Sequence, residues 1–332
     1  MNYLSIGKLD RVSALCLGGG SFGSQIGEER SNELLDCFFE AGGNFVDTAH
    51  VYGAWDPKGS NGGCGNSEVA IGRWMRSRKC RDKVVVGTKG GHPDFTTGES
   101  RLSREWIATQ LQESLEHLDT DYIDIYFLHR DDRSIPVAEI LDWLKEPVEA
   151  GQIRELACSN WRADRLLEAR AVAKRTGLPL LAANQISWSL AHANKTLVSN
   201  RFGEQVAMDD ETWEIHRREG IPMTAYQSQA GGLFAACANC EESEYEKPDF
   251  PKANMVRKFG NDLTWRRVRA AKAMASEKGC RAHHIALAWM LGQPFAAFPL
   301  IGASNVEQLR DSLRALEIAL TPEEFERLRK GA

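Results

Sequence analysis

The sequence of 332 residues predicts an α/β fold, a (β/α)8 TIM barrel that forms one domain over residues 1–332. Eight short apolar runs alternate with amphipathic stretches of helical length, as parallel strands joined by crossover helices do. The runs are almost continuously apolar, which is typical of strands buried on both faces. No linker or break in composition divides the chain. The alternative is a doubly wound protein with two domains.

The predicted strands and helices alternate along the chain. Strands are expected at residues 14–18, 44–48, 84–88, 122–129, 153–159, 181–186, 222–226 and 297–302. Helices are expected at residues 30–42, 67–79, 103–118, 137–150, 163–177, 209–219, 262–278 and 305–316. Ser103, followed by Glu105 in the first turn, marks the start of a helix. Gly151 marks the end of another, because a left-handed residue commonly stops a helix.

Two further elements lie outside the eight units. Residues 4–9 and 11–17 predict an N-terminal β-hairpin that turns at residues 8–11. Thr321 as a cap and Pro322 in the first turn predict an extra C-terminal helix.

Composition and charge exclude several classes of protein. The chain is 42% hydrophobic and 26% charged with a formal net charge of -5, an ordinary globular composition without the basic surface of a nucleic-acid binder. No apolar run reaches the ~18 residues of a membrane span, and the N-terminus has no apolar core of signal-peptide length. Six of the eight cysteines are scattered, as reduced thiols often are. We therefore expect a cytoplasmic protein with neither nucleic-acid nor membrane partners.

Polar or charged side chains end almost every predicted strand. Working residues of such barrels lie at the C-terminal ends of the strands, so these side chains are expected to meet at one mouth. In chain order they are Asp47, Tyr52 in the loop after it, Lys89, His129, Ser159, Asn160, Asn184, Gln185 and Tyr226.

Four of these residues suit acid catalysis by a phenol. A free tyrosine has a pKa of about 10, and a neighbouring cation such as Lys89 stabilises the phenolate and lowers that pKa. Asp47 is expected to hold Lys89 charged and oriented. His129 is expected to hydrogen-bond the oxygen on which charge develops. With Tyr52 as the acid, this set suits protonation of a carbonyl oxygen while hydride attacks the carbon.

Six segments then resemble the aldo-keto reductase superfamily, over nearly the whole chain. They are NFVDTAHVYG (44–53), VVVGTKGG (84–91), DIYFLHRDD (124–132), GQIRELACSNW (151–161), NQISWS (184–189) and PLIGASNVEQLRDSL (299–313). The resemblance implies reduction of aldehydes or ketones, or the reverse, by NAD(P)H without a metal. It implies catalytic roles for Asp47, Tyr52, Lys89 and His129. It also implies an extended cofactor across the barrel mouth, held by Gly20, Ser159, Asn160, Gln185, Tyr226, Gln227, Ser228, Gly302, Ser304, Gln308 and Asp311.

The chain departs from the family in the segments expected to bind the cofactor and the substrate. Gln308 stands where many members have Arg, although a 2′-phosphate favours Arg or Lys; NADP(H) is expected, with NAD(H) as the alternative. An insertion at residues 53–65 borders the expected substrate site, and residues 227–261 form a second long segment expected to be a loop. Flat and charged side chains near the motifs suit a sugar-like or other polar carbonyl: Trp55, His92, Arg130 and Trp161.

Two other functions are considered. A metal-dependent barrel hydrolase would use Asp47, His50, His92, His129 and Asp131 as ligands, but it leaves Lys89 and Tyr52 without a role. Cys237 and Cys240 have the spacing of half a zinc site, and no second such pair exists; no metal is expected. The other alternative is a regulatory or sensor subunit that binds the cofactor with low turnover. The oligomeric state is left open.

Overall fold

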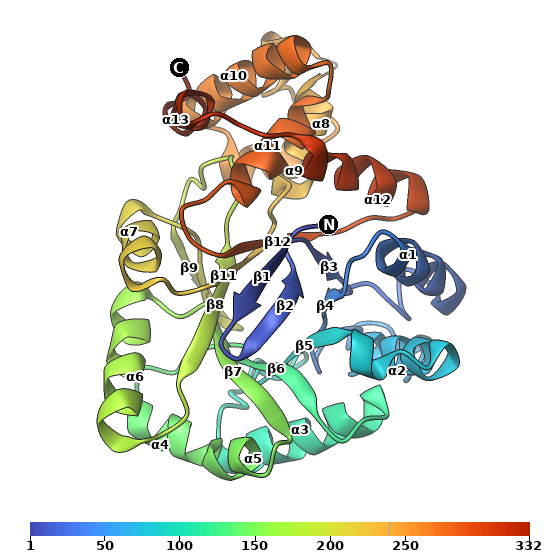
Figure 1. The fold of residues 1–332 in the computed structure, drawn as a ribbon, viewed down its shortest axis with the longest axis vertical. Coiled ribbons are helices and arrows are strands. Elements are labelled where there is room, and N and C mark those ends of the chain that lie inside the picture. Colours follow the sequence, from blue (N-terminus) through green and yellow to red (C-terminus); the bar gives the residue numbers. More distant parts are fainter. Residues whose placement is uncertain (239) are drawn as a thin grey trace.

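Eight parallel strands close into a barrel in the order β11-β12-β3-β4-β5-β6-β7-β8, which confirms the predicted fold class (Figure 1). This computed structural model describes residues 1–238 and 240–332. Each predicted barrel strand is present, with its ends displaced by at most two residues. The strands are β3 (Cys16–Gly18), β4 (Phe45–Asp47), β5 (Val85–Gly90), β6 (Ile123–Leu128), β7 (Ile153–Ser159), β8 (Leu181–Ser187), β11 (Met223–Tyr226) and β12 (Ala297–Ile301).

Helices surround the barrel at nearly the predicted positions. They are α1 (Glu28–Glu40), α2 (Asn66–Arg78), α3 (Arg104–Leu118), α4 (Val137–Trp143), α5 (Lys145–Glu149), α6 (Ala163–Thr176), α7 (Asp210–Glu219), α8 (Leu233–Ala238), α9 (Ala253–Phe259), α10 (Asp262–Lys278), α11 (Ala282–Leu291), α12 (Val306–Leu313) and α13 (Pro322–Lys330). The helix expected at 137–150 is instead two helices, α4 and α5. Pro147 explains the break, because its ring clashes with the carbonyl four residues earlier and it donates no hydrogen bond.

Three segments differ from the sequence-based prediction. Residues 227–261 were expected to be a loop, but they contain α8 and α9. Helix α11 was not among the predicted helices. An additional hairpin, β9 (Leu197–Asn200) with β10 (Gly203–Val206), was also missed, because its first strand is exposed throughout and lacks an apolar pattern.

The N-terminal hairpin is confirmed, but its turn lies earlier than predicted. Strands β1 (Tyr3–Ile6) and β2 (Leu9–Ser13) are antiparallel, with Ile6 opposite Leu9. The turn is therefore Gly7–Lys8, where Gly7 has a φ of 57°, a left-handed conformation that favours glycine.

The interior of the barrel is closed at its N-terminal end. Ile6 and Val12 of the hairpin belong to the same buried apolar cluster as Phe45, Phe127 and Phe298 of the barrel strands. The open end of the barrel is therefore the opposite, C-terminal end of the strands. Within the described residues, no helix combines the length and the apolar character that crossing a bilayer requires.

Candidate active site

Strands β4 and β5 bring Asp47 and Lys89 together at the mouth of the barrel. Asp47 is paired with Gly87 in the parallel ladder, and Lys89 is two residues further along on the same face. Lys89 Nζ lies 2.7 Å from Asp47 Oδ2 and 3.3 Å from the hydroxyl of Tyr52. Gln185 of β8 donates to the other oxygen of Asp47 at 2.8 Å. The expected group of Asp47, Tyr52 and Lys89 is therefore assembled.

Burial and charge act in opposite directions on the two titrating groups. Burial raises the pKa of Tyr52 above its ordinary value, and the charge of Lys89 offsets only part of this rise. The expected lowering of the pKa by Lys89 is thus present but smaller than the effect of burial. Burial alone would lower the pKa of Lys89, but Asp47 and Tyr52 together raise it. The phenol is protonated at neutral pH and lies beside a permanent cation.

His129 lies on the other side of Tyr52. Its ring centre is 6.0 Å from that of Tyr52, at an interplanar angle of 81°. Burial, with smaller effects from Arg130 and His92, lowers the pKa of His129 well below its ordinary value. A neutral imidazole carries one N–H donor. His129 can therefore hydrogen-bond an oxygen near Tyr52 without competing for its proton.

The residues expected to bind nicotinamide lie beside this group. Asn160 follows β7 in a left-handed conformation, with a φ of 60°. Its Nδ2 donates to Ser159 Oγ at 3.0 Å, and its Oδ1 accepts from the hydroxyl of Tyr226 at 2.7 Å. Gly20 lies beside the ring of Tyr52, since a Cβ at Gly20 would be 3.8 Å from Tyr52 Cε2. These side chains thus surround one space at the ends of β7, β8 and β11.

That space is a cavity of about 250 Å³. Its lining consists of Val51, Tyr52, Trp55, His92, Phe95, His129, Arg130, Ser159, Asn160, Gln185, Phe202, Gln205 and Tyr226. Of the four residues expected at the substrate, Trp161 is not among them. It is fully buried, and its indole N–H donates to the carbonyl of Arg130 at 3.3 Å, so it supports the wall from behind. Phe95 and Phe202 were missed; Phe202 lies in the unpredicted β9–β10 hairpin, and the sequence around Phe95 carries no motif.

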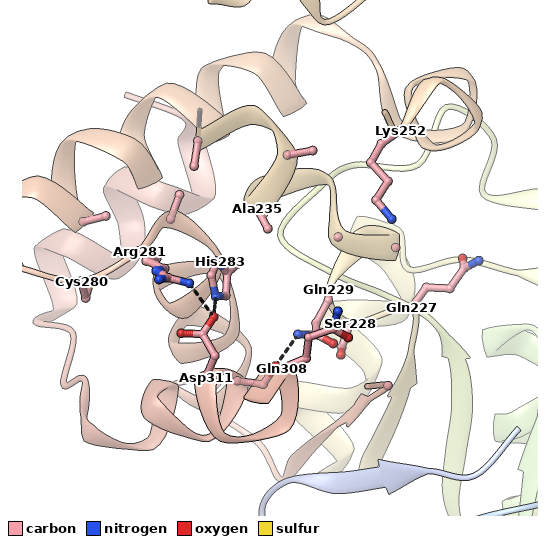
Figure 2. A pocket seen from close by; sticks show the side chains of 18 of the residues that line it. Gln227, Ser228, Gln229, Ala235, Lys252, Cys280, Arg281, His283, Gln308 and Asp311 are labelled. Atoms are coloured by element: carbon pink, nitrogen blue, oxygen red, sulfur yellow. Dashed lines mark hydrogen bonds and ion pairs between the residues drawn. The ribbon is translucent and has the colours of Figure 1, made fainter. Parts of the chain in front are cut away.

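A second, larger cavity of about 1180 Å³ begins at Gln227, the residue after Tyr226. All the remaining expected cofactor residues line it: Gln227, Ser228, Gly302, Ser304, Gln308 and Asp311. Figure 2 shows Lys252 with Gln227 at one end of this cavity and Arg281 with Asp311 at the other. Residues between 227 and 238, which include α8, supply one wall together with Lys252. The two cavities have separate linings, which meet in the sequence at Tyr226 and Gln227, and the larger one has cations at separate points along it.

Asp311 is held by donors from the start of α11. Its carboxylate lies 2.7 Å from His283 Nε2, 3.1 Å from His284 Nε2 and 3.2 Å from Arg281 Nη1 (Figure 2). In the part of the chain that the structure describes, this is the one group of three or more side chains that meets the geometry of a metal site. The positive Arg281 on the same carboxylate disfavours a cation there. No sequence motif connects His283 with the cofactor residues.

Several residues considered as metal ligands of a hydrolase are paired with other side chains. Asp47 is paired with Lys89, His50 Nε2 lies 2.6 Å from Glu113, and Asp131 is paired with Arg165. The structure does not gather these residues into one site. Cys237 and Cys240 are free thiols, and Asn239 between them lies outside the described residues.

Comparison with known proteins decides the family. The model of the Aldo/keto reductase family matches residues 14–331. The chain belongs to this family. It is 31% identical over 330 residues to the uncharacterized oxidoreductase YrpG of Bacillus subtilis (strain 168), a match that covers 97% of this chain and 93% of that one. It is 28% identical over 334 residues to norsolorinic acid reductase B of Dothistroma septosporum (strain NZE10 / CBS 128990), with coverage of 96% of this chain and 78% of the relative.

A solved structure supports the fold of this aldo/keto reductase. The crystal structure of the thermostable aldo-keto reductase Tm1743 with the inhibitor epalrestat matches over 100% of both chains, with a TM-score of 0.72 and 23% identity. Membership of the family makes the protein an oxidoreductase, and the family generally reduces carbonyl compounds with a nicotinamide cofactor. The predicted family and barrel are thereby confirmed.

Proposed function

We propose that this aldo/keto reductase reduces an aldehyde or ketone to an alcohol with NADPH, and that Tyr52 supplies the proton. The observation that carries the proposal is the position of Lys89, bonded to Asp47 and 3.3 Å from the hydroxyl of Tyr52. The bound cofactor supplies the hydride to the carbonyl carbon. Tyr52 gives its proton to the carbonyl oxygen, and Lys89 stabilises the phenolate that remains.

The other residues of the small cavity position the reactants. His129, being neutral, donates a hydrogen bond to the carbonyl oxygen beside Tyr52. Ser159, Asn160 and Gln185 hold the nicotinamide carboxamide, and Tyr226 packs against the ring. Such positioning supplies a large part of the rate, because it replaces the entropy of bringing reactants together.

The large cavity suits the remainder of the dinucleotide. Its volume fits the larger part of a dinucleotide, and its lining begins at Gln227, the residue after Tyr226 of the small cavity. Lys252 is available to the pyrophosphate, while Arg281, paired with Asp311, lines the same cavity as Ser304 and Gln308, which are expected to hold the adenosine end. Arg281 supplies the positive charge that Gln308 lacks, which favours the 2′-phosphate of NADPH over NADH.

The test is a titration of purified protein with NADPH and NADH, followed by turnover of a panel of carbonyl compounds. Tyr52→Phe keeps the ring and removes only the acid. We expect its affinity for NADPH to stay within a few-fold of the wild type and its turnover to fall by about 10²- to 10⁴-fold.

Two results would contradict the proposal. Absence of binding of either nucleotide would remove the reductase assignment. Tight binding of NADPH with negligible turnover of the whole panel by the wild type would instead indicate a regulatory subunit.

A further inference from the structure

The most unusual charged group in the catalytic cavity is Arg130, which follows His129 directly. The residue is 8% exposed and lines the cavity with Tyr52 and His129. Its Nε donates to the carbonyl of Phe202 at 2.9 Å, and its Nη1 donates to that of His129 at 3.0 Å. Among residues 1–238 and 240–332, neither a carboxylate within 4.0 Å of Arg130 nor a hydrogen-bond partner of Nη2 is found. The guanidinium is therefore fixed through Nε and Nη1, and Nη2, at its tip, has no partner among the described residues.

Nearby acids do not compensate this charge. Asp131 is buried and paired with Arg165 at 3.2 Å, and Glu204 is paired with Arg162. The two histidines beside Arg130 are neutral at physiological pH, because burial lowers the pKa of His92 to about 4 and that of His129 well below its ordinary value. Buried charges in proteins are normally paired. An unpaired guanidinium next to the proposed acid thus indicates that a ligand brings the anion.

The walls around Arg130 are flat. The rings of Phe95 and Phe202 are stacked, with centres 5.6 Å apart and an interplanar angle of 10°. Trp55 lies 5.8 Å from Phe95, and His92 lies 5.4 Å from Phe202. These rings come from three separate segments, the 53–65 insertion, the segment after β5 and the β9–β10 hairpin. A planar, aromatic body fits such a space better than a puckered sugar ring does.

We propose that the substrate is an aromatic aldehyde or ketone that carries a carboxylate, bound by the tip of Arg130. This inference rests on the proposed function and narrows its substrate class. The carboxylate does not react. The carbonyl carbon gains the hydride, the carbonyl oxygen gains the proton of Tyr52, and the nicotinamide is oxidised. Arg130 can hold a carboxylate through two parallel hydrogen bonds, a geometry that Lys does not reproduce.

The experiment compares 4-formylbenzoate with 4-formylbenzamide, two aldehydes of nearly equal shape that differ in charge. With the full chain and NADPH, we expect kcat/KM to be about 10- to 100-fold higher for the carboxylate, the range for hydrogen bonds to a charged group. Arg130→Gln should reduce this ratio to near one. The matched control is Arg133→Gln, which removes an exposed guanidinium paired with Asp164 and should leave the ratio unchanged. A carboxylate without a ring, 4-oxobutanoate, should be a poorer substrate than 4-formylbenzoate.

A binding measurement keeps the inference separate from the proposed reaction. Calorimetry should show 4-formylbenzoate binding to the wild-type NADP⁺ complex and about 10-fold or weaker binding to the Arg130→Gln complex. That pattern would support the anion site even if no aldehyde turned over, in which case only the proposed reaction fails. Equal kcat/KM for the two aldehydes, or equal binding by wild type and Arg130→Gln, would overturn the inference while leaving a reductase intact.

Discussion

Lys89 shows how one buried cation is made permanent by its neighbours. Taking an ammonium out of water is costly, and burial pushes the pKa of Lys89 down. Asp47 and Tyr52 reverse this effect, and the backbone carbonyl of Thr48 accepts a further hydrogen bond at 2.5 Å. The cation therefore stays charged where the phenolate of Tyr52 would form. Asp47, Tyr52 and the carbonyl of Thr48 all contact the same atom, Nζ of Lys89.

The pH dependence of the two reaction directions follows from these residues. Reduction needs the protonated phenol, whose pKa lies above its ordinary value of about 10, whereas oxidation of the alcohol needs the phenolate. We expect kcat/KM for reduction to be flat between about pH 6 and 9 and to fall only as pH rises through the pKa of Tyr52. Oxidation should accelerate with pH. His92, with a pKa of about 4, does not titrate in this range. Initial rates measured in both directions from pH 5 to 10.5 test this expectation. A reduction rate that already falls below pH 7.5 as the pH is raised would contradict it.

At the residue scale, the positions of the proposed catalytic residues were easier to predict from the sequence than the other residues that line the small cavity. Asp47, Lys89 and His129 end buried strands, so the barrel rule places them at one mouth. Trp161 was misassigned because adjacency to Asn160 says nothing about side-chain direction, and its indole turns inward. Phe202 belongs to no motif, and its position depends on the β9–β10 hairpin, which lies far along the chain from His92.

At the scale of elements, the start of α11 meets α12 through one carboxylate. Arg281, His283 and His284 reach Asp311 on α12, and this contact fixes the far end of the large cavity. A loss of Arg281 therefore removes charge from one end of the proposed cofactor path while α11 and α12 remain joined by two histidines.

Arg281→Ala should weaken NADPH binding by about 10-fold or more and leave NADH binding within about 2-fold, because only NADPH carries the additional phosphate. Fluorescence titration with both nucleotides measures this directly. Arg269→Ala, which removes an exposed guanidinium of α10 paired with Glu242, is the control and should change neither affinity. Equal weakening for the two nucleotides would show that Arg281 does not discriminate between them.

The eight strands were predictable because burial on both faces leaves a continuous apolar signature, as in β7 and β8. Elements without such a signature were not. Strand β9 is exposed along its whole length, and α8 and α9 interrupt a stretch rich in small and charged residues. The helix expected at 137–150 was too long because its amphipathic pattern continues across Leu144, where the backbone separates α4 from α5.

For the whole molecule, the proposed cofactor site draws on both cavities, so the cofactor should bind the folded state alone. NADPH at 100 times its dissociation constant is expected to add about 2.7 kcal/mol to the free energy of unfolding. For a chain of this length, that corresponds to an increase in Tm of roughly 4 °C. Thermal unfolding at several NADPH concentrations measures the shift. The Tyr52→Phe variant should show the same shift, and a Tm independent of NADPH would contradict binding across both cavities.

The three segments that form the flat walls carry none of Asp47, Lys89 and His129, which end strands of the closed barrel. A lineage could therefore exchange these segments, one at a time, by insertion or recombination without passing through an inactive ancestor. Selection for a particular substrate would act on Trp55, Phe95 and Phe202, while selection for turnover would act on the residues at the strand ends. The reaction and the substrate specificity of the protein can therefore evolve separately.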